Sequence, residues 1–221
     1  MALINLKNEK AEKTIFILTL AIATVWAVLY FMPEVSFAFK KSVTLPVLAL
    51  GGLFLLPWQM FLAMLFSGIG DLMGDLHIFM AQLGFFALAH ICMLSYFIKL
   101  LKIRKIRLSK LEIMATAVTA GTLCCISFLK IVPHAPAGVV QIGTIVYTCL
   151  IVAMFVTAVM HRSPLLTIAA ALFVASDMIL AINKFVQPLE GQRYLIMVPY
   201  YLAQLLFFIR TSSVGQKYAW D

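Results

Sequence analysis

The chain of 221 residues is much more apolar than a soluble domain, because 63% of its residues are hydrophobic and only 12% are charged. Soluble domains have about 45–50% apolar and about 25% charged residues. The formal net charge of +8 has no aromatic–basic interleaving or Gly-rich phosphate loop beside it, so we exclude nucleic acid as a partner. The composition predicts an all-α integral membrane protein with a single transmembrane domain, residues 1–221. Spans of about 20 residues each account for its length.

Eight apolar runs divide the chain. The first is too long for the apolar region of a signal peptide and is predicted to be retained as a span. The region 42–76 would be about 50 Å long as one helix, against a bilayer core of about 30 Å, so it must fold back, and Pro57 is the natural break. The predicted spans are 14–32, 42–56, 57–76, 78–98, 111–131, 139–160, 165–183 and 194–209.

An even number of spans puts both termini on one side of the membrane. Most Lys and Arg residues lie on that side, with six of them in the predicted loop Lys99–Lys110. The positive-inside rule therefore predicts an eight-helix bundle with both termini in the cytoplasm. The loop could also bind anionic headgroups, but its role in setting the orientation is favoured. We expect a multi-pass protein of the cytoplasmic membrane in a bacterium, or of the endoplasmic reticulum in a eukaryote.

Acidic residues inside two of the apolar runs are the main sign of function. Asp71 and Asp75 lie in SGIGDLMGDLHIFMAQLGFFALAH, which ends at His90, and Asp177 lies in LFVASDMILAIN. A charge at the centre of a membrane helix costs about 2.5–3.5 kcal/mol on insertion scales, so such residues usually face a bundle interior or a cavity. One buried Asp can be a structural hydrogen-bonding group. Three acids in two runs favour a functional site.

Several polar residues are predicted to lie at about the same depth in the membrane. Counted from the non-cytosolic helix ends, Asp71, Asp177 and the Tyr200-Tyr201 pair lie about 9–12 Å into the membrane. Gln204 lies one turn deeper than Tyr200. His90 lies about 20 Å in, so we expect it not to touch Asp71, and either to line the bottom of a cavity or to bond a neighbouring helix.

Other kinds of site fit the residues less well. Ser67 shares a helix face with Asp71, but the chain has no G-x-S-x-G motif, which disfavours a serine hydrolase. A zinc site from Asp71, Asp75, His77 and His90 matches no known spacing. Asp75 itself is close enough to the interface to be a solvated helix end. We expect neither a metal nor an organic cofactor.

Three blocks of residues together resemble the lysoplasmalogenase family, the YhhN-like membrane proteins. They occur in the family's order and span about two thirds of the chain. The first is Ser67, Gly70, Asp71, Gly84, Phe86 and His90; the second is Leu172, Phe173, Ser176, Asp177, Leu180, Ala181, Asn183 and Phe185; the third is Y-Y-L-A-Q-L-L from Tyr200 to Leu206.

The resemblance implies an eight-span hydrolase that cleaves the vinyl ether bond of lysoplasmalogens, with a lysophospholipid as substrate and membrane lipids around it. Asp71 and Asp177 match the family's acidic motif residues and are predicted to be catalytic. The predicted supporting or substrate-binding residues are Ser67, Asp75, His90, Ser176, Asn183, Tyr200, Tyr201, Gln204 and Lys41, of which Lys41 could hold the phosphate.

The expected chemistry needs two carboxyl groups in different protonation states. A vinyl ether is cleaved by protonation of its β-carbon, and the resulting oxocarbenium ion then takes up water. One acid must hold a proton while the other stays a carboxylate, as in paired-carboxylate glycoside hydrolysis. The alternative function is a proton-coupled transporter or lipid flippase that uses the same acids. The chain shows no convincing internal repeat of the kind many transporters have.

Overall fold

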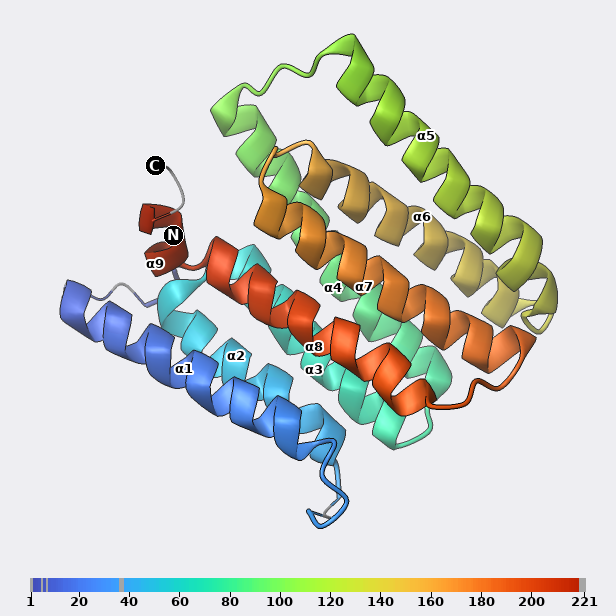
Figure 1. Cartoon of the computed structure of the whole chain (residues 1–221), viewed down its shortest axis with the longest axis horizontal. Helices are drawn as coiled ribbons and strands as arrows, with labels where there is room; N and C mark the ends of the chain where they lie inside the picture. The colour runs from blue at the N-terminus through green and yellow to red at the C-terminus, as the bar shows by residue number, and fades with distance from the viewer. Residues whose placement is uncertain (1, 5, 7, 36–37, 219–221) are drawn as a thin grey trace. The chain divides into compact units, whose positions relative to one another are not determined.

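The computed structural model describes residues 2–4, 6, 8–35 and 38–218. Within these ranges it contains nine α-helices and no β-strand (Figure 1). In chain order they are α1 (Glu9–Leu29), α2 (Thr44–Leu55), α3 (Trp58–Asp75), α4 (Phe79–Arg104), α5 (Lys110–Ile126), α6 (Val139–Val159), α7 (Pro164–Ala181), α8 (Gln192–Thr211) and α9 (Ser213–Tyr218).

Six helices in the described part of the chain are long and apolar enough to cross a membrane: α1, α4, α5 with its continuation to His134, α6, α7 with its continuation to Val186, and α8. This confirms the all-α, multi-pass prediction. The helix α2 has 12 residues, about 18 Å at 1.5 Å per residue, which is shorter than a bilayer core. The count of eight spans and the cytoplasmic termini stay predictions.

The exposed surface carries many large apolar side chains, while several polar side chains are buried. Large apolar side chains point outwards, with Leu111 76% and Val139 74% exposed, while Asp71 is 1% and Gln204 0% exposed. A contiguous apolar surface of this kind needs a cover. Hydrocarbon lipid is the cover that suits helices whose backbone groups are all bonded internally, which supports the membrane assignment.

The predicted break at Pro57 is confirmed. The helix α2 ends at Leu55, Leu56 is extended with ψ 147°, and α3 starts at Trp58. The ring of a proline excludes the preceding residue from the helical region. The chain therefore turns back at this point, and α2 and α3 become packed neighbours.

The predicted loop Lys99–Lys110 is partly wrong, because α4 continues to Arg104. The residues from Lys99 to Arg104 contain no helix breaker, and basic side chains are favourable in the last turn of a helix. The helix stops where Lys105 takes a positive φ of 49°. After α8 the chain forms the short helix α9.

Contacts divide the chain into two compact units. Unit 1 comprises Met1–Tyr96 and Gln204–Asp221, and unit 2 comprises Phe97–Ala203. In unit 1, α1 packs on α2 and α2 on α3; in unit 2, α5 packs on α6 and α6 on α7 (Figure 1). Of the two predicted catalytic acids, Asp71 lies in unit 1 and Asp177 in unit 2.

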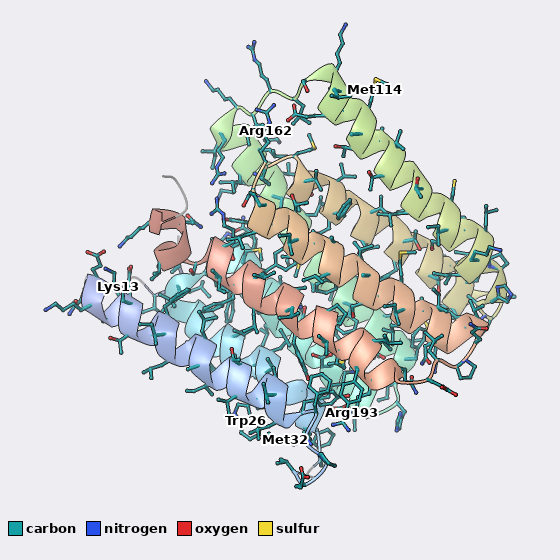
Figure 2. The ribbon with its side chains drawn as sticks, in the orientation of Figure 1. Lys13, Trp26, Met32, Met114, Arg162 and Arg193 are labelled. Atoms are coloured by element: carbon teal, nitrogen blue, oxygen red, sulfur yellow. The ribbon has the colours of Figure 1, made fainter. Side chains whose placement is uncertain are left out.

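An ion pair at the surface of unit 2 joins the turn between α6 and α7 to the first turn of α5. Arg162, in the turn between α6 and α7, donates from Nε and Nη2 to the Glu112 carboxylate at 2.7 and 2.6 Å, and Figure 2 labels it near the start of α5. Glu112 also closes a capping box with Ser109, which satisfies two backbone groups at the N-terminus of α5. The pair fixes where α5 begins and carries no part of the candidate chemistry.

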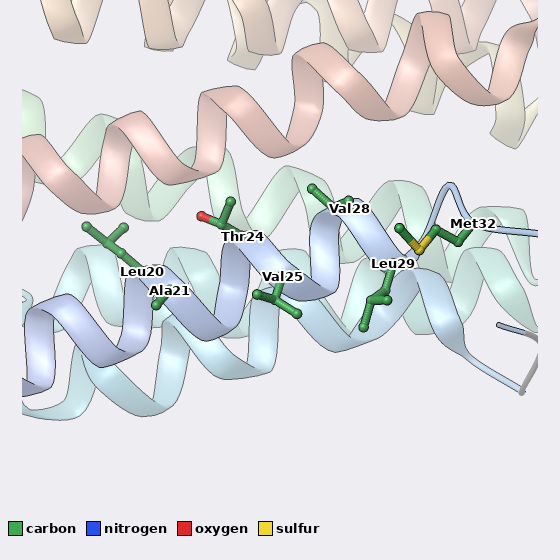
Figure 3. A pocket seen from close by; sticks show the side chains of 7 residues that line it. All are labelled: Leu20, Ala21, Thr24, Val25, Val28, Leu29 and Met32. Carbon is green, nitrogen blue, oxygen red and sulfur yellow. The ribbon is translucent and has the colours of Figure 1, made fainter.

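A hollow of about 600 Å³ runs along one face of α1 in unit 1 (Figure 3). Its lining consists of Leu20, Ala21, Thr24, Val25, Val28, Leu29 and Met32. This surface of aliphatic side chains on a candidate span suits lipid chains. It contains no titratable group, so the candidate site has to be built from the buried acids instead.

Candidate functional site

The first acid cluster lies in unit 1 and consists of Lys41, Ser42, Asp71 and Asp75. The Lys41 Nζ atom is 3.6 Å from Asp71 Oδ1, and the Asp71 side chain is 1% exposed. Ser42 donates from Oγ to Asp75 Oδ2 at 2.7 Å. Asp75 is the last residue of α3, as the favoured reading of a helix end requires, but it is half-buried and hydrogen-bonded.

The local backbone brings these side chains together. The 3-10 helix η1 (Lys40–Val43) follows Phe39, which has a positive φ of 64°, and leads directly into α2. Because α2 and α3 are packed neighbours, Lys41 and Ser42 reach the last turns of α3. A Cβ added at Gly74 would lie 2.8 Å from Lys41 Nζ and 2.7 Å from Gln82 Nε2, so the glycine gives the ammonium group room against the helix.

A second polar contact lies one turn away along the same face of α3. Ser67 and Asp71 are four residues apart and so share a face. Ser67 Oγ accepts a hydrogen bond from Gln204 Nε2 at 3.2 Å, and both side chains are 0% exposed. The contact joins two of the three blocks that the sequence singled out. It gives α3 a polar column running from Ser67 through Asp71 to Asp75.

His90 is also fully buried in unit 1. Its Nδ1 atom is 2.7 Å from the carbonyl oxygen of Phe86, four residues earlier in α4, which suits an Nδ1–H donor. The Phe86 ring in turn lies against α3, because a Cβ added at Gly70 would meet ring carbons at 2.9 Å. Gly70 and Phe86 thus set how closely α4 approaches α3 beside Asp71.

Because of this close approach, we predict that alanine substitution has very different effects at two glycines. We expect Gly70→Ala to destabilise the protein by about 1–3 kcal/mol, the usual cost of overpacking, and to lower its activity by moving α4 away from Asp71. Gly84→Ala is the matched control, since a Cβ there would meet nothing within 4 Å. Thermal unfolding of both variants in detergent checks this; equal midpoints would refute the packing argument.

The second acid cluster lies in unit 2 and consists of Tyr147 and Asp177. The Tyr147 hydroxyl donates to Asp177 Oδ2 across the packed pair α6 and α7. The sequence reasoning missed Tyr147. A signal was present, because Tyr147 lies eight residues after the start of α6 at Val139, about 12 Å at 1.5 Å per residue. That is the level calculated for Asp177, and a buried phenol needs a hydrogen-bond partner.

Aromatic rings and a serine fix α7 and α8 against each other near Asp177. Phe173, one turn before Asp177, meets the Tyr200 ring edge-on with 5.6 Å between centroids. Tyr200 lies 5.7 Å from Tyr201, and both are at most 3% exposed. Ser176 donates to the carbonyl of Ile196 at 2.9 Å. These contacts fix the part of α7 that carries Asp177 against α8.

Asn183 lies further along, in the π-helical turn η4 (Ile182–Val186) that ends α7. Its amide donates to Gln192 Oε1, and its carbonyl oxygen accepts from the Leu189 backbone N–H at 2.8 Å. Asn183 therefore organises the connection between α7 and α8. The second predicted block thus divides into an acid, Asp177, and residues such as Ser176 and Asn183 that shape its helix.

The blocks described above lie within the part of the chain that matches a known protein family. The model of the YhhN family matches residues 36–211. The chain belongs to the YhhN family. The match covers both acid clusters and confirms the resemblance drawn from the sequence. Neither a curated protein nor a solved structure matches the chain.

Each acid cluster of this YhhN protein offers a buried carboxyl group with a defined partner. The Lys41 ammonium group lies 3.6 Å from Asp71 Oδ1 and can offset the charge of that carboxyl group. Asp177 instead accepts a hydrogen bond from the Tyr147 phenol, a neutral group that can donate to a carboxylic acid or to a carboxylate. In the described part of the chain, no group of three or more His, Cys, Asp or Glu side chains is placed to hold a metal ion.

Proposed function

We propose that this YhhN protein is a membrane-embedded lysoplasmalogenase. It hydrolyses the vinyl ether bond of lysoplasmenyl-ethanolamine or lysoplasmenyl-choline to a fatty aldehyde and glycerophosphoethanolamine or glycerophosphocholine. The observation that carries the proposal is that two buried acids within the range matched by the family model, Asp71 and Asp177, contact side chains of different charge, Lys41 and Tyr147. Acid–base chemistry needs two carboxyl groups whose surroundings separate their protonation states.

The reaction needs nothing beyond these groups and water. One carboxylic acid protonates the β-carbon of the vinyl ether, and one carboxylate stabilises the oxocarbenium ion or orients the water that adds to it. The hemiacetal then collapses to aldehyde and alcohol. Gln204 and the Tyr200-Tyr201 pair are candidates for orienting the glycerol oxygen. Lys41 is proposed to act on Asp71 rather than on the phosphate, because its ammonium group already faces the carboxylate.

A panel of three lysolipids tests the function. We expect purified protein in detergent to release aldehyde from the plasmenyl lysolipid and to leave the alkyl and acyl analogues intact, because only an enol ether can take a proton on carbon. The readout is aldehyde release together with loss of substrate by mass spectrometry. Equal turnover of the acyl analogue would indicate an esterase. Absence of turnover for all three would refute the hydrolase and favour the transporter, which is assayed in sealed vesicles.

A further inference from the structure

Tyr147 on α6 bonds Asp177, and neither the family motifs nor the sequence reasoning assigns it a role. Its hydroxyl group donates to one oxygen of the Asp177 carboxyl group, Oδ2. The two residues are 30 positions apart in sequence, so tertiary packing alone brings them together. A phenol that bonds one oxygen of an acid in an apolar helix pair fixes the rotation of the carboxyl group.

The helix that carries Asp177 is already fixed by other contacts. Ser176 bonds the Ile196 carbonyl at 2.9 Å, and Phe173 packs on Tyr200. The backbone of Asp177 therefore needs no help from Tyr147 to stay in place. What the phenol adds is control of the carboxyl group itself, which suggests a chemical rather than a packing role.

The partner of Asp177 bears on whether its carboxyl group carries the proton. A neutral phenol donates to Asp177 Oδ2, which suits the acid that supplies the proton in the proposed hydrolysis. This step rests on the proposed function.

We propose that Tyr147 is a positioning residue for proton transfer from Asp177 to the vinyl ether. In the resting state the phenol donates to the carbonyl oxygen Oδ2, and Oδ1 carries the proton. The π electrons of the C=C bond take that proton to form a C–H bond on the β-carbon, leaving the oxocarbenium ion and the Asp177 carboxylate. Water adds to the cation and returns a proton to Asp177. The hemiacetal C–O bond then breaks, and its hydroxyl proton moves to the glycerol oxygen, so the cycle consumes one water molecule.

The hydrogen bond from Tyr147 strengthens during this transfer, because its acceptor changes from a neutral acid to a carboxylate. Charge-assisted hydrogen bonds are about twice as strong as neutral ones. An interaction that is stronger in the transition state than in the ground state raises kcat rather than substrate affinity. Tyr147 therefore acts on the rate of the chemical step.

The test is Tyr147→Phe, which keeps the ring and removes the hydroxyl. We expect kcat to fall about tenfold, the difference between a charge-assisted and a neutral hydrogen bond, while KM stays unchanged. Tyr147→Phe should have no further effect in the Asp177→Asn background. Tyr194→Phe is the matched control, because Tyr194 is 53% exposed, and it should keep full activity. An unchanged kcat, or equal losses in both backgrounds, would overturn the proposal.

An infrared measurement separates this inference from the proposed function, since it needs no turnover. The band of the protonated Asp177 carboxyl group is identified by its loss in Asp177→Asn. We expect it to move to higher frequency in Tyr147→Phe, because a hydrogen bond to the carbonyl oxygen lowers its stretching frequency. A band that does not move, or a wild-type protein without one, would refute the role of Tyr147. Failure of the wild type to release aldehyde would refute the hydrolase instead.

Discussion

Substitution of either buried acid by its amide should abolish most of the activity. We expect Asp71→Asn and Asp177→Asn each to lower turnover by about 10²-fold or more, the lower end of what positioned acid–base groups contribute. Asn is nearly isosteric with Asp but can neither hold nor transfer the proton. The fold should survive, because each substitution removes a costly charge from an apolar setting. Aldehyde release, normalised to monodisperse protein, measures the effect.

The double variant and a neighbouring acid provide the controls. If Asp71 and Asp177 serve one reaction, the double variant should be little worse than either single variant, since residues that act as a unit are non-additive. Asp75→Asn should lose much less, because the amide oxygen can still accept the hydrogen bond from Ser42. Near-normal turnover in either the Asp71 or the Asp177 variant would contradict the assignment. A large loss at Asp75 with none at Asp177 would move the site to the end of α3.

Removing the partner of Asp71 should cost stability more than removing Asp71 itself. We expect Lys41→Met to lower the free energy of unfolding by about 3 kcal/mol, the lower end of the cost of breaking a buried ion pair. The reason is that Asp71 is 1% exposed and loses the ammonium group that offsets its charge. Titration of the folded protein with SDS in mixed micelles measures the change.

Two further variants separate the ion pair from a general effect of losing a lysine. Lys40→Met is the matched neighbour, because Lys40 bonds the Met32 carbonyl, and it should cost clearly less. The double variant Lys41→Met/Asp71→Asn should be more stable than Lys41→Met, since it removes the charge that the lysine offsets. Equal stability of the Lys40 and Lys41 variants would show that the ion pair contributes little.

Much of the fold follows from the sequence because the membrane makes simple demands on it. Apolar runs of about 20 residues must be helical there, since a helix satisfies its backbone groups internally. For the same reason Pro57, which cannot continue a helix, correctly located the turn between α2 and α3. The end of α4 was missed because basic residues suit both a loop and a last helical turn, and only the backbone at Lys105 decides between them.

The candidate site, like the fold, could be predicted from the sequence only in part. The sequence alone singled out Asp71 and Asp177 as candidates, because a carboxyl group in an apolar run is costly, and both lie within the range that the YhhN family model matches. Only the tertiary structure decided their partners. Lys41 reaches Asp71 from another segment and Tyr147 reaches Asp177 from another helix. Side-chain contacts between segments depend on which helix faces pack together, and neither composition nor spacing along one helix contains that information.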